Sequence, residues 1–152
     1  MKRKVSLAIA LVSLVLSSSV ACPDAFAGKA IDWDKKLVKA RQLIDTNNCE
    51  EAMKIIQDFM KKHPESGALH TEMGKALKQR GKMGQAKAQF KRSTEVEPAY
   101  APAWYELGAM QEVDKEYKIA IDSYERYLQM DPATDRKGAV QERIAFCKSK
   151  AD

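Results

Sequence analysis

The chain of 152 residues is poor in the residue types that build most catalytic and metal sites. It contains 2 His and 3 Cys, and neither type recurs at a spacing typical of a zinc site. It has no G-x-S-x-G motif, no P-loop and no glycine-rich dinucleotide-binding turn. The carboxylates alternate with Lys and Arg on helical patterns, which is typical of a solvated surface. These absences predict a protein that is not an enzyme and that uses no metal or other cofactor.

Glycine, proline and long runs of one charge are also scarce. With 7 Gly and 5 Pro, and with 45% hydrophobic and 31% charged residues, the composition is typical of a water-soluble helical protein. No run of five like charges follows residue 27, so nothing indicates a nucleic-acid partner.

The longest apolar run, residues 5–16, is shorter than the roughly 20 residues of a membrane span. It follows a basic segment and precedes small residues, which is the order of a secretory signal peptide. Ala25 and Ala27 form an A-x-A cleavage site, so we expect residues 1–27 to be removed and the chain to begin at Gly28 as an exported, periplasmic protein of a bacterium. Removal takes away three basic residues and one acidic residue and lowers the net charge from +5 to +3.

A second reading of the same segment remains open. The sequence SVAC at residues 19–22 resembles a bacterial lipobox, in which the cysteine becomes the lipidated first residue. Ser19 stands where that motif usually has a leucine-like residue. On this alternative, Cys22 anchors the protein to a bacterial membrane.

The rest of the chain repeats itself every 34 residues. Gly74 and Gly108 are in register, and so are three alanines and three prolines: Ala52, Ala86 and Ala120, and Pro64, Pro98 and Pro132. A period of this length is typical of stacked helical repeats. We expect a short linker at 28–32, three helix-turn-helix units at 33–66, 67–100 and 101–134, and a capping helix at 135–150. The fold class is therefore all-α, a right-handed α-solenoid.

Each unit has a break between its two helical patterns. Asn47 and Gly81 occupy matching places in the first two breaks and can adopt the left-handed conformation that ends a helix. Lys115 stands there in the third unit, where we expect the turn to form less easily. The glycines at 74 and 108 lie inside a helical pattern, at a cost of roughly 1 kcal/mol relative to Ala. We expect that cost to be offset by close packing where two helices cross.

The repeat resembles that of the tetratricopeptide repeat (TPR) family. The third unit has residues of the family pattern at Trp104, Leu107, Gly108, Ala120, Tyr124 and Pro132. The second has them at Met73, Gly74, Leu77, Gly81, Ala86, Phe90 and Pro98. The first is degenerate, with Lys36, Lys39 and Ala40 at positions that are usually apolar, and is held by Leu43, Ala52, Ile56, Phe59 and Pro64. The resemblance implies a binding surface on the concave side, formed by the first helices of the units.

The capping helix and the remaining cysteines have structural interpretations. Val140, Ile144 and either Phe146 or Cys147 form an apolar stripe that would cover the last repeat. Cys49 and Cys147 are too far apart in a stacked array for a disulfide, so we expect buried thiols, with an intermolecular disulfide as the alternative. His63 and His70 are expected to be structural or exposed.

Helical periodicity selects the residues of the concave face. The outward residues of the first helices and of the cap are Leu37, Arg41, Ile44, Thr71, Glu72, Lys75, Lys78, Tyr105, Glu106, Ala109, Glu112, Arg136, Ala139 and Arg143. Among these, the candidate binding residues are Arg41, Thr71, Glu72, Lys75, Lys78, Tyr105, Glu106 and Glu112. The asparagines with which some family members grip acidic C-terminal tails are absent, so that specificity is not expected.

The sequence therefore predicts a non-enzymatic interaction scaffold of the bacterial cell envelope. Its partner would be a peptide or another protein bound on the concave face. The alternative is a pilotin-like lipoprotein assembly factor tethered through Cys22. A third hypothesis, of a different class, is a thiol enzyme that uses Cys49.

Overall fold

The computed structural model describes the backbone of residues 27–151 and the side chains of residues 35–151. The expected signal peptide, its cleavage site and the candidate lipidation residue Cys22 lie outside the described residues, apart from Ala27.

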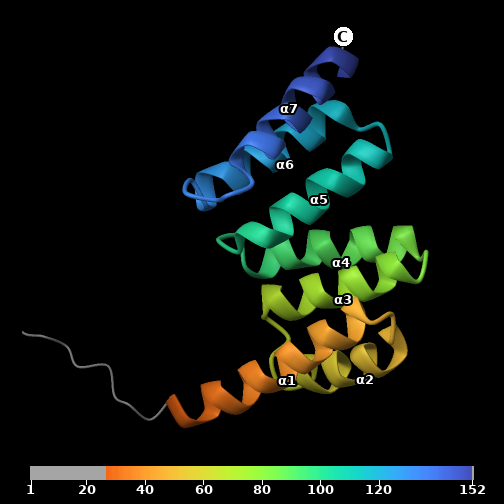
Figure 1. Cartoon of the computed structure of the whole chain (residues 1–152), viewed down its shortest axis with the longest axis vertical. Coiled ribbons are helices and arrows are strands. Elements are labelled where there is room, and N and C mark those ends of the chain that lie inside the picture. The colour runs from red at the N-terminus through yellow and green to blue at the C-terminus, as the bar shows by residue number, and fades with distance from the viewer. Residues whose placement is uncertain (1–26, 152) are drawn as a thin grey trace, which may run out of the picture.

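The described part of the chain is a stack of seven α-helices and contains no strand. The helices are α1 (Ala27–Asp45), α2 (Cys49–Met60), α3 (Gly67–Gln79), α4 (Met83–Val96), α5 (Ala101–Val113), α6 (Tyr117–Met130) and α7 (Lys137–Ala151). They form three antiparallel hairpins, α1/α2, α3/α4 and α5/α6, and α7 closes the stack (Figure 1). The expected all-helical solenoid is confirmed.

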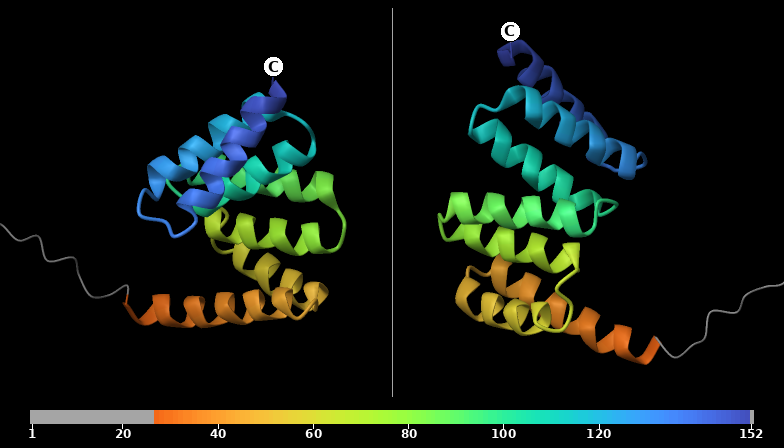
Figure 2. Two further views of the ribbon diagram at one scale, coloured as in Figure 1. Left: turned by 45° about the horizontal axis from the view of Figure 1, so that its top comes forward. Right: turned by 180° about the vertical axis from the view of Figure 1, so that it is seen from behind.

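Two expected boundaries are wrong in detail. Residues 28–32 are not a linker, because α1 already begins at Ala27 and its first turns project beyond the stack (Figure 2). Helix α7 begins at Lys137 rather than at residue 135, because residues 135–136 still belong to the turn after α6.

The order of contacts defines the inner side of the solenoid. Each helix packs on its neighbour in the chain, and in addition α1 contacts α3 and α3 contacts α5. Within the described residues, α2, α4 and α6 make no comparable contacts with one another. The first helices are therefore closer together than the second helices, which places α1, α3 and α5 on the concave side.

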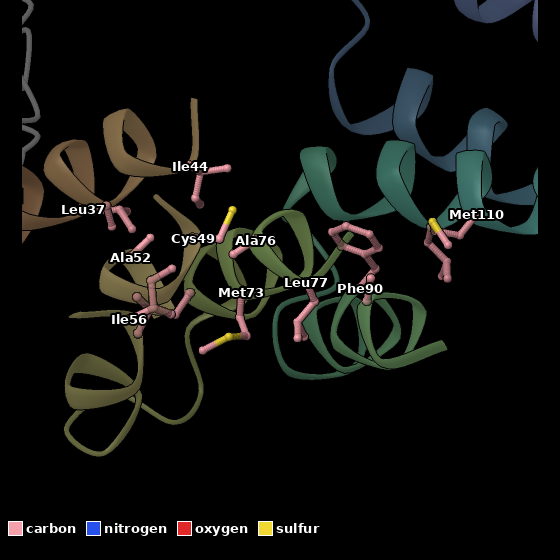
Figure 3. Packing of buried hydrophobic residues seen from close by; sticks show 14 residues of the cluster. Leu37, Ile44, Cys49, Ala52, Ile56, Met73, Ala76, Leu77, Phe90 and Met110 are labelled. Atoms are coloured by element: carbon pink, nitrogen blue, oxygen red, sulfur yellow. The ribbon is translucent and has the colours of Figure 1, made fainter. Parts of the chain in front are cut away.

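The repeated glycines make room for aromatic rings. A Cβ atom built on Gly74 would lie 2.5 Å from Cε1 of Phe90, and one built on Gly108 would lie 2.9 Å from Cδ1 of Tyr124. Phe90 and Tyr124 are fully buried. We expected the two helices of each hairpin to approach closely at these glycines. The nearest atoms to each glycine belong to an aromatic ring of the second helix, Phe90 or Tyr124. Figure 3 shows Phe90 with Leu77 and Met110 in the buried cluster.

The three turns inside the hairpins share one backbone conformation. The φ angles are 62° at Asn47, 72° at Gly81 and 62° at Lys115, all in the left-handed region. The expectation for Asn47 and Gly81 is confirmed. Lys115 adopts the same conformation, which is unfavourable for a residue with a Cβ.

A hydrogen bond at the same position joins each hairpin to the next, and a different side chain makes it each time. Trp104 Nε1 donates to the carbonyl oxygen of Pro98 at 2.8 Å, and His70 Nε2 lies 3.0 Å from the carbonyl oxygen of Pro64. His70 is buried, and its Nδ1 lies 2.8 Å from Gln89 Oε1. The histidine thus takes the place of the tryptophan, and its role is structural.

The last helix covers the third hairpin as expected. Val140, Ile144 and Cys147 are buried, whereas Phe146 is 46% exposed and makes an edge contact with Tyr117. The apolar stripe therefore ends in Cys147. Cys49 is also buried, and within the described residues Cys49 and Cys147 are free thiols.

Candidate functional site

Four of the residues expected to face outward on the concave side are buried instead. Leu37 and Ile44 belong to the hydrophobic core, and Thr71 and Glu72 have exposures of 0% and 1%. Thr71 Oγ1 lies 2.9 Å from Ser93 Oγ, within the α3/α4 hairpin. The prediction for these residues is wrong because neighbouring helices cover them: α4 covers Thr71, and α1 packs on α3 at Glu72.

The buried carboxylate of Glu72 links two repeats. Arg41 Nε donates to Glu72 Oε1 at 2.8 Å from α1, and Lys75 Nζ lies 3.2 Å from the same oxygen. Arg41 also interacts with the Tyr100 phenol. Burial, with Glu72 nearby, raises the pKa of Tyr100 above its ordinary value. A buried carboxylate needs such partners, since leaving it unpaired would be costly.

A second pair crosses from α3 to α5. Lys78 Nζ donates to Glu106 Oε2 at 2.6 Å, and the side chain of Glu106 is 13% exposed. The same ammonium lies 5.8 Å from the centre of the Phe90 ring. Lys78 and Glu106, both candidate binding residues, are therefore already paired with each other inside the protein.

A third group crosses from α5 to α7. Arg143 donates to Glu112 Oε2 at 3.1 Å and to the Tyr124 hydroxyl at 2.8 Å, and that hydroxyl donates to Glu112 at 2.8 Å. Burial and the bond to Glu112 raise the pKa of Tyr124 well above its ordinary value. Burial also raises the pKa of the neighbouring Cys147 thiol, which makes it a poor nucleophile at neutral pH.

Three of the eight candidate binding residues, Lys75, Tyr105 and Glu106, line one pocket. A cavity of about 230 Å³ is lined by Lys75, Pro102, Tyr105, Glu106, Tyr127, Asp131 and Arg136. The Tyr105 ring lies 5.4 Å from that of Tyr127 and 6.1 Å from that of Tyr124, and the Arg136 guanidinium lies over it at 5.3 Å. We refer to this cavity as the Tyr105 pocket.

Three of the seven lining residues, Lys75, Tyr105 and Glu106, are candidate binding residues from the sequence, and Arg136 belongs to the wider set of residues expected to face outward. Pro102, Tyr127 and Asp131 belong to neither set. Tyr127 and Asp131 belong to the second helix and its end, so a search of the first helices alone could not find them. A sequence signal for Asp131 was its place in the turn between α6 and α7, because this turn leads the chain back to the concave side.

A broader hollow of about 500 Å³ lies at the edge of the stack, between the α2–α3 turn and the end of α4. Its lining includes Glu97, whose Oε2 accepts a hydrogen bond from the Gly67 N–H at 2.9 Å. That carboxylate caps the start of α3, so its role is structural.

Within residues 27–151 no group of three or more His, Cys, Asp and Glu side chains could hold a metal ion. The thiol of Cys49 is buried and donates to Gln79 Oε1 at 3.5 Å. None of the described helices has the length and apolarity needed to cross a bilayer.

Comparison with known proteins supports the helical repeat. No family model matches the chain. The chloroplastic tetratricopeptide repeat domain-containing protein PYG7 of Arabidopsis thaliana is 29% identical over 84 residues, which are 53% of this chain and 28% of that protein.

Solved structures share the fold at low sequence identity. The first TPR of Spaghetti (RPAP3), bound to the HSP90 peptide SRMEEVD, has a TM-score of 0.67 at 17% identity and covers 76% of this chain and 90% of its own. The TPR2B-domain:pHsp70-complex of yeast Sti1 has a TM-score of 0.65 at 17% identity, and the match covers 76% of this chain and 98% of that one. The chain therefore has a TPR-like fold.

Proposed function

We propose that this protein is a non-enzymatic interaction scaffold that holds a peptide or a partner protein on its concave face. The Tyr105 pocket carries the proposal. It lies on the side where the first helices converge, and it combines apolar walls with a few polar groups, as ligand sites do. One solved structure of the same fold contains an HSP90 peptide and another is a complex with pHsp70, which supports a peptide or protein partner.

The scaffold reading accounts for the residues that would otherwise suggest chemistry. His70 closes a repeat, Cys49 packs inside the first hairpin, and Glu72 and Glu112 join neighbouring repeats. Replacing Cys49 and Cys147 by Ser should leave partner binding intact, and loss of function in that variant would favour the thiol enzyme.

The cell envelope is the proposed site of action. The support is the order of basic, apolar and small residues in the first 27 positions. Mass spectrometry of the mature N-terminus separates the two forms of this proposal. An unmodified start at Gly28 supports a free periplasmic protein, and a lipidated Cys22 supports the tethered assembly factor.

Site-specific crosslinking tests where the partner binds. A photoreactive phenylalanine analogue replaces Tyr105 in one variant and Val113 in a matched control, which is 71% exposed and lies at the end of α5. We expect a discrete adduct in living cells from position 105 and none from position 113. Equal adducts from both positions, or none from 105, would contradict binding at the concave face.

A further inference from the structure

We infer that the Tyr105 pocket selects a peptide segment without net charge, which it anchors by one apolar or aromatic side chain and holds by its main chain. This inference rests on the proposed function and specifies the chemistry of the ligand. It distinguishes this site from one that grips an acidic tail.

The charges that line the pocket cancel. Lys75 and Arg136 contribute two positive charges, and Glu106 and Asp131 contribute two negative charges. A ligand of either sign therefore meets attraction and repulsion within the same cavity. Charge complementarity favours a neutral segment.

Two of the four charged groups are already used inside the protein. Lys75 is bound to Glu72 at 3.2 Å, and Glu106 is bound to Lys78 at 2.6 Å. A charged ligand would have to compete with these pairs, because each joins or supports neighbouring repeats. Their contribution to a ligand is therefore small.

Three polar groups at the pocket remain available. Among the described residues, no side chain hydrogen-bonds to or forms an ion pair with the carboxylate of Asp131, and none hydrogen-bonds to the hydroxyl of Tyr105. The Arg136 guanidinium stacks on the Tyr105 ring and has no carboxylate partner in the described residues. One acceptor, one donor and one hydroxyl suit the N–H and C=O groups of a peptide backbone.

The apolar walls set the size of the anchor. Pro102, Tyr105 and Tyr127 offer rigid surfaces, and the ring of Tyr105 is fixed between those of Tyr124 and Tyr127. Pockets for drug-sized ligands measure roughly 300–1,000 Å³. The Tyr105 pocket, at about 230 Å³, is smaller and fits one large side chain with the main chain around it.

A selection experiment on the full chain tests the inference. The probe is a random dodecapeptide library displayed on phage, and enriched peptides are resynthesised with acetylated and amidated ends. We expect enriched peptides to share one apolar or aromatic anchor and no excess of acidic or basic residues. Their affinity should change by less than about twofold between low salt and about 0.3 M salt, because screening acts on charge pairs.

Variants assign the binding to the pocket. Asp131→Asn and Arg136→Gln should each weaken the enriched peptides by about threefold to tenfold, the effect of one hydrogen bond. Arg126→Gln is the matched control, because Arg126 stacks at 4.8 Å on Trp104 and does not line the pocket. Tyr105→Ala should weaken binding more than about tenfold, with the thermal unfolding of each variant recorded alongside.

The outcomes separate the inference from the proposed function. Enriched acidic peptides whose affinity falls more than about tenfold in salt, and which depend on Tyr105, would overturn the inference and keep the concave binding face. Peptides that are insensitive to all three pocket variants, or no enriched peptides, would overturn both.

Discussion

The ring of Phe90 lies in the space that a side chain at position 74 would need. A Cβ atom on Gly74 would approach three carbon atoms of that ring to 2.5, 2.7 and 2.9 Å, which is closer than real Cβ contacts. The ring is fully buried and cannot move into solvent. The glycine is therefore required by the packing of the second hairpin.

Gly74→Ala should destabilise the protein although Ala is the better helix former. Moving the Phe90 ring aside is overpacking, which costs roughly 1–3 kcal/mol and exceeds the roughly 1 kcal/mol that Ala contributes to the helix. Chemical denaturation monitored by circular dichroism measures the free energy of unfolding. Gly84→Ala is the control, because nothing lies within 4 Å of a Cβ there. The prediction is wrong if the two variants gain equal stability.

Lys115→Gly should stabilise the third hairpin. Lys115 has a φ of 62°, and a left-handed residue with a Cβ costs roughly 1–2 kcal/mol. Part of this gain is offset by the greater freedom of Gly in the unfolded chain, so we expect about 0.5–1 kcal/mol in denaturant unfolding. Gly81→Ala, at the matching turn with a φ of 72°, should change stability in the opposite direction. A loss of stability in Lys115→Gly would refute the turn geometry.

Glu72→Gln should weaken the joint between the first two repeats. The side chain of Glu72 is 2% exposed and is bound to Arg41 and Lys75, so the neutral amide leaves two cations without their counter-charge. We expect a loss of about 1–3 kcal/mol in the free energy of unfolding. Asp58→Asn removes a carboxylate from a surface pair that is 75% exposed and should cost less than about 0.5 kcal/mol. Similar losses in both variants would show that burial does not matter here.

Stability should fall at alkaline pH, and Tyr124 should contribute to the fall. Its pKa is raised in the folded protein above the ordinary value near 10, so the folded state holds the phenolic proton more tightly than the unfolded chain does. The contribution is complete below about pH 10 and is lost as pH rises from there toward the folded pKa. Tyr124→Phe should be less stable at pH 8 and should show a shallower decline above pH 10, measured by denaturant unfolding.

Tyr100 should contribute to the same alkaline decline, because burial raises its pKa as well. Tyr100→Phe and Tyr124→Phe should each remove part of the alkaline decline, and the double variant should remove more. An unchanged decline in Tyr124→Phe would contradict the assignment.

The architecture could be predicted from the sequence because its determinants are local and repeated. Gly74 and Gly108 and the turn residues Asn47 and Gly81 each act within one hairpin, and the carbonyl oxygens of Pro64 and Pro98 bind the first helix of the next hairpin. A fixed period then implies that hairpins stack. The long first helix could not be predicted, because nothing in residues 28–32 repeats elsewhere in the chain.

The candidate site could be predicted only in part, because it depends on how the repeats pack on one another. Periodicity assigns Thr71 and Glu72 to the outward side of a single helix, yet Thr71 is buried against α4 and Glu72 is buried where α1 meets α3. Tyr127 joins the pocket because α6 packs on α5, and Arg136 joins it because the turn before α7 places its guanidinium over the Tyr105 ring. Such relations between helices leave no periodic signal.

The ion pairs between repeats also make the hairpins non-interchangeable. Lys78 finds its partner in Glu106 of the following unit, and Glu112 finds its partner in Arg143 of the cap. A duplicated third unit would set Glu112 beside another copy of Glu106, with Ala109 where Arg143 now stands. Like charges would then oppose each other at the joint. The charges at the joint between the third hairpin and α7 are thus specific to that joint, and insertion of a second copy of the third unit would need compensating substitutions.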